Sequence, residues 1–229
     1  DLFWRVMDES TPSSIAAMLE REYLRGGSRG LAEFARTRIG DGDQLARTVQ
    51  ALPAYYAALR ASSRRVEEFK PVMRRAVQCL QAIYPETAAP KVTFVIGRMS
   101  SAGTVDGRHV LIGVDMFGKG DEATMAGLSS WHRAVVAPMA RLPFVVGHEL
   151  IHTQQSLRPG GTLLTAALNE GVADFLGQLI SGETINPHLH AFAQGRHAEL
   201  WRDFEKDMNG RDLSRWLYQG NKTTADRPA

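Results

Sequence analysis

The chain has 229 residues, a length at which one compact domain is expected, with or without a helical extension. Its 27 lysine and arginine residues nearly balance its 25 aspartate and glutamate residues, so charge indicates neither a nucleic acid nor an anionic membrane as partner. The single cysteine, Cys79, excludes an internal disulfide, and no apolar run approaches the ~20 residues of a transmembrane segment.

Residues 1–84 are predicted to be helical, because apolar residues recur at helical spacing throughout this region. Side chains of the type that caps helices are expected to begin three of the helices, at Thr11, Ser28 and Asp43. Pro53 and Pro71 are expected to break or kink the later helices, because proline lacks the backbone N–H that a helix interior requires.

The pattern changes after a proline-punctuated linker at 85–90. Residues 91–96 are rich in β-branched and aromatic side chains, which predicts a strand. Two more strands, 103–105 and 109–114, flank Asp106-Gly107, and Asp-Gly between such runs is a strong hairpin signal. We therefore expect a small antiparallel or mixed sheet, followed by a loop and one helix over 115–141.

A helix starting at Leu142-Pro143 carries the motif on which the functional interpretation depends. His148, Glu149 and His152 form His-Glu-x-x-His, and on a helix positions i and i+4 share one face. The two imidazoles can therefore bind one metal ion, and Glu149 can take a proton from a water held by that metal. Zinc accepts imidazole and carboxylate ligands in a tetrahedral site with an open position. The alternative is a helix whose histidines are packed or solvated for other reasons.

A second helix is predicted over 162–176, after a turn at 158–161. A short connection makes two helices antiparallel neighbours, so Glu170 can supply the third protein ligand. Asp174 lies one turn further on and can accept the other N–H of a ligand histidine, which fixes the tautomer of that histidine. The alternative is that both acids are solvated on a helix face.

The apolar residues around these acids predict that the second helix is largely buried, where acids need partners. They are Leu168, Val172, Phe175 and Leu176. Two small residues, Gly171 and Ala173, are expected to let the two helices approach closely.

Two motifs carry a family resemblance, His148-Glu149-x-x-His152 and Asn169-Glu170-x-x-x-Asp174. Together they resemble the gluzincins, the thermolysin-like zinc metallopeptidases. The resemblance implies two zinc ligands and a general base from the first motif. It implies a glutamate ligand, with an aspartate and an asparagine that support the ligands, from the second. More narrowly, 142–155 and 170–174 look like a bacterial family of predicted zinc-dependent proteases related to the gliding-motility lipoprotein GldB. The specific part covers about residues 90–180.

The resemblance implies further features of a substrate cleft. Gluzincins line the cleft with the edge strand of a sheet, so the strand at 110–114 is expected to bind an extended peptide, or else to be a plain structural hairpin. They stabilise the oxyanion with a tyrosine or histidine from further along the chain. The candidates here are His188, His190, His197 and Tyr218. Related members continue into a tyrosine-rich segment beyond the equivalent of Ala229, before which this chain ends.

The predicted fold class is α+β and mostly α. A helical region, 1–84, is expected to pack as one unit with a zincin-like core, 85–229. This core contains the small sheet, the active-site helix and the second ligand-bearing helix. A bacterial location in the periplasm, in the cell envelope or outside the cell is favoured over the cytoplasm, since the chain begins at Asp1 as it would after removal of a leader.

The predicted function is that of a zinc peptidase that binds one Zn²⁺ ion, acts on a peptide or protein and uses Glu149 as general base. One alternative is a non-catalytic envelope or accessory protein that retains zinc. Another is a zinc hydrolase of a different amide or ester bond, since fold and site do not fix the substrate. Structural zinc sites normally use four protein ligands, often cysteines, whereas two histidines and one glutamate leave a position free, which favours catalysis.

Overall fold

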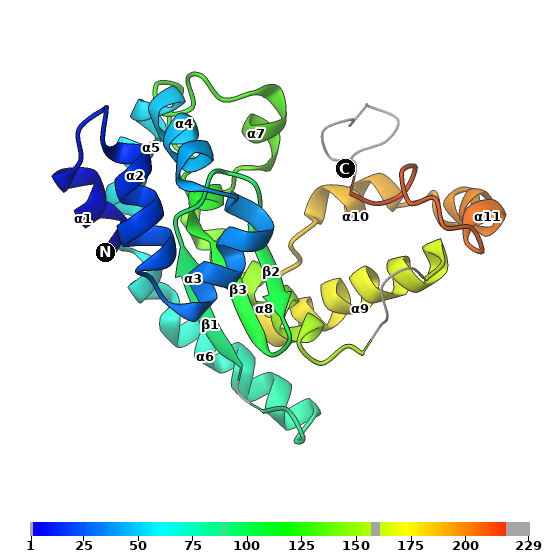
Figure 1. Ribbon diagram of the computed structural model, residues 1–229. Helices are drawn as coiled ribbons and strands as arrows, with labels where there is room; N and C mark the ends of the chain where they lie inside the picture. Colours follow the sequence, from blue (N-terminus) through cyan, green and yellow to red (C-terminus); the bar gives the residue numbers. More distant parts are fainter. Residues whose placement is uncertain (1, 89, 157–160, 219–229) are drawn as a thin grey trace.

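The computed structural model describes residues 2–88, 90–156 and 161–218. Over these residues the fold is α+β and mostly helical, as predicted, with one small mixed sheet (Figure 1). None of the helices described is both long enough and apolar enough to cross a bilayer. Apart from Gly161, the turn predicted at 158–161 lies outside the described residues, and so does the chain end at Ala229.

Helices form the part of the chain before the sheet, and η1 and η2 continue α2 and α3 as π-helical turns. The elements are α1 (Leu2–Glu9), α2 (Ile15–Met18), η1 (Leu19–Arg25), α3 (Arg29–Phe34), η2 (Ala35–Ile39), α4 (Gly42–Ala51), α5 (Pro53–Ser63) and α6 (Val66–Ile83). Pro53 begins a separate helix, as a break predicts, whereas Pro71 lies inside α6.

Only one of the three predicted caps is confirmed. Ser28 caps α3 with its hydroxyl group. The side chain that caps α4 is Asp41 and not Asp43, because Asp41 is the residue in extended backbone conformation whose carboxylate accepts a backbone N–H of the first turn. Thr11 lies in a turn, and α2 begins only at Ile15.

The sheet consists of β1 (Lys91–Val95), β2 (Gly103–Asp106) and β3 (His109–Gly113), in the order β1-β3-β2. β3 is parallel to β1 and antiparallel to β2. The expected hairpin is present, with Gly107 at a φ of 57° in its turn. The prediction that residues 110–114 form an edge strand is wrong, because β3 is paired on both sides; the edge strand on the hairpin side is β2.

Helices cover both faces of the sheet. On one face α3 approaches so closely that a Cβ at Gly30 would lie 2.5 Å from the side chains of Thr93 and His109. On the other face lies α8 (Leu142–His152), which contacts β2 and β3. One hydrophobic core runs from α1 to α9 and so includes residues from both predicted regions. The sheet and the core thus fix the position of α8 within the molecule.

The remaining elements follow the sheet. They are η3 (Val114–Phe117), α7 (Ser130–Val135), η4 (Met139–Arg141), α9 (Leu163–Ser181), α10 (Pro187–Ala193) and α11 (His197–Asp207). Helices α9, α10 and α11 extend to one side of the body (Figure 1). Backbone hydrogen bonds from Leu163 to Gly210 and from Leu164 to Met208 join the start of α9 to the segment after α11.

The prediction that α9 is largely buried is wrong. Leu168, Val172, Phe175 and Leu179 are 56%, 40%, 68% and 58% exposed. They lie on the side of α9 opposite Glu170 and Asp174, the acids that face α8. Leu176 is partly buried against the core, as expected. Apart from Leu163 at its start, α9 is therefore buried only on the face that packs on α8 and α6.

Candidate metal centre

Helices α8 and α9 are antiparallel neighbours, as predicted. Gly147 near the middle of α8 lies against Gly177 and Ser181, whereas Gln155 just beyond α8 bonds to Asn169 near the start of α9. The approach is closest at Gly177, where a Cβ would lie 2.9 Å from the Cα of His148. The predicted role of Gly171 is wrong, because a Cβ there would meet nothing within 4 Å; Ala173 is fully buried.

Most residues of helix α8 are apolar, and the helix is packed between the sheet, α6 and α9. Its polar residues are therefore placed in the interior: His148 is 7% exposed and Glu149 is 8% exposed. Polar side chains buried to this degree require specific partners.

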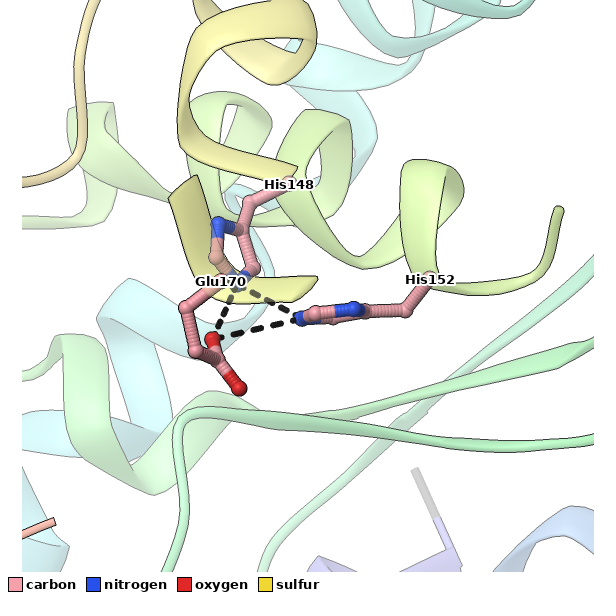
Figure 2. Close-up of side chains that lie close together, drawn as sticks. All are labelled: His148, His152 and Glu170. Carbon is pink, nitrogen blue, oxygen red and sulfur yellow. Dashed lines mark hydrogen bonds and ion pairs between the residues drawn. The ribbon is translucent and has the colours of Figure 1, made fainter. Parts of the chain in front are cut away.

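Three side chains converge between the two helices (Figure 2). The Nε2 atoms of His148 and His152 lie 2.9 Å apart, and the Oε2 atom of Glu170 lies 3.5 Å from each of them. A point about 1.9 Å from all three atoms exists, close to the length of zinc bonds to imidazole nitrogen and carboxylate oxygen. These three residues can therefore hold one metal ion.

The donor set also fits a metal ion chemically. Two imidazoles and one carboxylate suit zinc and its neighbours among the transition metals, whereas calcium and magnesium prefer oxygen ligands alone. Cys79, the single cysteine, is exposed on α6 and does not belong to the group.

Asp174, the predicted partner of a ligand histidine, lies beside His148. The Asp174 Oδ1 atom lies 2.8 Å from Nδ1 of His148, the ring nitrogen that faces away from the other donors. The Oδ2 atom of Asp174 accepts a hydrogen bond of 2.9 Å from the side-chain amide of Asn186. A carboxylate in this place fixes the ring orientation and increases the basicity of Nε2.

Gln155 supports His152 in the same way. Its amide nitrogen donates to the Asn169 carbonyl at 2.8 Å, so its amide oxygen is the atom that lies 2.6 Å from Nδ1 of His152. The Nδ1 atom must then carry the proton, which leaves Nε2 free to bind a metal. Asn169 was expected to support the ligands; in the structure its backbone carbonyl accepts the Gln155 amide.

Tyr218, one of the predicted oxyanion candidates, bonds directly to this group. Its hydroxyl donates to Oε1 of Glu170 at 2.7 Å, which leaves Oε2 facing the histidines. His190 contacts the Thr184 hydroxyl at 3.2 Å. His188 and His197 are exposed on α10 and at the start of α11, and none of the three histidines belongs to the metal-binding group.

Glu149 lies beside the ligands in the wall of a cavity of about 310 Å³. It is packed against the edge strand: a Cβ at Gly103 would lie only 2.5 Å from its Oε1 atom. Burial raises the pKa of Glu149, and the charges of His148 and His152 oppose that rise.

The ligands perturb one another strongly. Burial disfavours protonated His148, but its contacts with Asp174 and Glu170 outweigh burial and raise its pKa to about 9. Burial likewise opposes protonation of His152, and the bonds to Glu170 and Gln155 raise its pKa. Burial would raise the pKa of Glu170, but hydrogen bonds from both histidines and Tyr218 hold it well below its usual range. A metal ion would therefore replace protons that these groups hold.

No family model, no curated protein and no solved structure matches this chain. The resemblance to gluzincins therefore stays a prediction that rests on the residues of the two motifs.

The sequence did not identify four residues that shape the site: Gly103, Gln155, Gly177 and Asn186. Gln155 had a local signal, since an amide three residues after His152 lies about one helical turn away. Gly177 and Gly103 could be found only from the packing of α8 against α9 and β2. Asn186 follows the end of α9 and had no signal near the motifs.

Loss of a metal ligand and loss of a residue that orients a ligand should differ in their effect on metal affinity. We expect Glu170→Ala, which removes a ligand, to weaken affinity by orders of magnitude. Asp174→Ala and Gln155→Leu remove only orienting contacts and should each cost about 10- to 100-fold. Asn169→Ala is the matched control, since its backbone carbonyl remains and affinity should not change. Competition with a chromogenic chelator measures each constant. Wild-type affinity in Glu170→Ala would place the third ligand elsewhere.

Metal binding should release protons. The pKa of His148 is raised to about 9, so at pH 7 the metal-free site holds a proton that the metal must displace. Apparent affinity should therefore increase with pH, by about tenfold per unit for each displaced proton, and level off above about pH 9. Calorimetry at pH 7 in two buffers of different ionisation enthalpy measures the release. Equal heats in both buffers would contradict the assignment.

Proposed function

We propose that the chain is a zinc-dependent peptidase. One observation carries the proposal: two imidazole nitrogens and a carboxylate oxygen converge on one point, and a fourth side chain that cannot join them, Glu149, faces a cavity beside them. A zinc ion held there would polarise a substrate carbonyl and lower the pKa of a water toward ~7. With three protein ligands, the site has room for that water and the substrate.

Glu149 is suited to act as the general base. It follows His148 directly, so it projects about 100° around the helix from the ligand face and cannot share the metal. Its burial raises its pKa, which brings its basicity closer to that needed near neutral pH. It can take the proton of the attacking water and pass it to the leaving amine.

The backbone of β2 offers a place for an extended substrate. Ala102 and Gly103 line the cavity together with Glu149, and β2 is the edge strand on this side of the sheet. An edge strand can bind a peptide through its main-chain groups. β3, which the sequence suggested for this role, has both edges paired.

The cavity beside Glu149 is suited to an apolar side chain. Most of its wall is apolar, and the lining residues include Met116, Phe117, Val135, Ala137, Val145 and Ile185. Arg141, which also lies in the wall, is paired with Glu183 at 2.6 Å and donates to the Thr184 carbonyl. Substrates with a large apolar residue next to the scissile bond should therefore be preferred.

The variant Glu149→Gln tests the proposed function. It should bind zinc with the same stoichiometry as wild type but lose peptide hydrolysis, because the amide cannot accept the proton. The matched control is Glu205→Gln, the same change at an exposed glutamate of α11, and it should keep full activity. Metal content is measured by mass spectrometry and hydrolysis with a peptide library.

Equal hydrolysis by wild type and Glu149→Gln would contradict the role of this residue. Zinc bound at one ion per chain with no hydrolysis of any peptide would instead support the accessory role considered from the sequence.

A larger side chain in the cavity should change substrate preference. Ala137→Leu should lower the preference for a large apolar residue over alanine by about 10-fold or more, with metal affinity unchanged, because it takes up space for the substrate side chain. Ala61→Leu on the exposed surface of α5 is the control. The ratio of kcat/KM for paired peptides measures the change. A preference unaltered by Ala137→Leu would remove the cavity from substrate binding.

A further inference from the structure

Two segments beside α8 form walls of the cavity that contains Glu149. The first is the connection from β1 to β2, residues 96–102, which leads into Gly103. The second is η3, the turn after β3, which contributes Met116 and Phe117. Both segments meet at a single buried side chain, that of Asp115 in η3.

Asp115 is 1% exposed, and both oxygens of its carboxylate accept hydrogen bonds from backbone amides. Its Oδ1 atom accepts the N–H of Gly97 at 2.6 Å, and its Oδ2 atom accepts the N–H of Met99 at 2.5 Å. Tyr55 donates its hydroxyl to the Asp115 carbonyl at 2.6 Å. Burial raises the pKa of Asp115 to about 6, while the backbone donors favour its charged form. A carboxylate this deeply buried is kept at a cost in free energy.

The 96–102 segment does not adopt a relaxed conformation. Met99 has a φ of 61°, in the left-handed region that residues other than glycine disfavour, and its side chain is 1% exposed. Its N–H is held by Asp115, and its carbonyl lies 3.1 Å from Nε2 of His132 in α7. Such a conformation persists only where the surroundings impose it. The Asp115 carboxylate is the side chain that bonds two amides of this segment, while Tyr56 donates to the Gly97 carbonyl and Arg98 donates to the Ile39 carbonyl.

The C-terminal end of the 96–102 segment leads into Gly103, which lies against Glu149. Ala102 accepts the N–H of Gly113, and Gly103 follows as the first residue of β2. The carboxylate of Glu149 occupies the space that a Cβ at Gly103 would fill. A small shift of this backbone would therefore push against Glu149 or release it.

We propose that Asp115 is a positioning residue of the peptidase site proposed above. By binding Gly97 and Met99 it fastens the β1–β2 connection to η3, and so fixes Gly103 against Glu149 and sets the width of the cavity. Asp115 itself touches neither the metal ligands nor the substrate.

Two kinds of role can be separated for such a residue. If Asp115 only stabilised the fold, its loss would act like the loss of any buried group, with a lower melting temperature and an active native state. A positioning role requires more: the native protein must still bind metal normally, because its ligands come from α8 and α9, while the chemical step slows. A displacement of about 1 Å at a reacting group can cost about 100-fold in rate.

The test compares Asp115→Asn with a control that weakens the fold elsewhere, Val49→Ala in the buried face of α4. The asparagine keeps the size of Asp115 but turns an N–H₂ group toward a backbone N–H. We expect Asp115→Asn to keep zinc affinity, to lose about 10- to 100-fold in kcat with little change in KM, and to exchange the amide hydrogens of residues 97–103 faster. Val49→Ala should lower the melting temperature without any of these changes.

Several results would overturn the role of Asp115. One is wild-type kcat and wild-type amide exchange in Asp115→Asn; another is equal effects of both variants. If Asp115→Asn does not fold, Tyr55→Phe, which removes the hydrogen bond to the Asp115 carbonyl, takes its place: a lower kcat with wild-type zinc affinity supports the proposal, and wild-type kcat with a lower melting temperature overturns it. Amide exchange needs no substrate, so it tests whether Asp115 fastens the 96–102 segment even if wild type proves inactive, which would count against the peptidase function alone.

Discussion

The structure depends on the close antiparallel packing of α8 against α9. The backbones approach most nearly where Gly177 faces His148, at a distance that excludes even a methyl group. This contact places Glu170 opposite the gap between the two histidines and Asp174 behind the first of them. Since α8 is also fixed by the sheet, both the ligands and Glu149 are held by elements of the core and not by loops. Ligands on rigid elements keep their geometry before any metal binds.

The face of α9 that packs on α8 is also the face that carries its acidic side chains. The acids of α9 are Glu170 and Asp174, and both turn toward the histidines, while the opposite face of the helix is apolar. The carboxylates stabilise the protonated imidazoles of the metal-free site, so the same contacts that perturb the pKa values prepare the site for a divalent cation. On the other side of α8, the buried carboxylate of Asp115 organises the backbone that borders Glu149. The two half-buried acids of α9 thus orient the metal-binding residues, while the buried Asp115 carboxylate separately holds the backbone beside the cavity.

The sequence predicted what depends on local pattern. Helical spacing and the β-branched run gave the mostly α class, the three strands and the shared face of His148 and His152. It also gave the pairing of Glu170 and Asp174 with that face, because i and i+4 positions stay together on any helix. Prediction from the sequence failed where the outcome depends on packing or pairing with another element of the fold. The central position of β3 follows from its parallel pairing with β1, which no local signal indicates. Apolar composition predicted burial of α9, but burial also requires a neighbour, and Phe175 shows that the outer face has none among the described residues.

The central claim is that one metal ion binds three donors supplied by α8 and α9. Anomalous diffraction from a crystal grown with zinc measures this most directly, at wavelengths on either side of the zinc absorption edge. We expect one peak per chain, about 2.0–2.2 Å from Nε2 of His148, Nε2 of His152 and a carboxylate oxygen of Glu170. A fully loaded protein whose anomalous peak lies away from these atoms, or whose imidazoles turn away from Glu170, would contradict it.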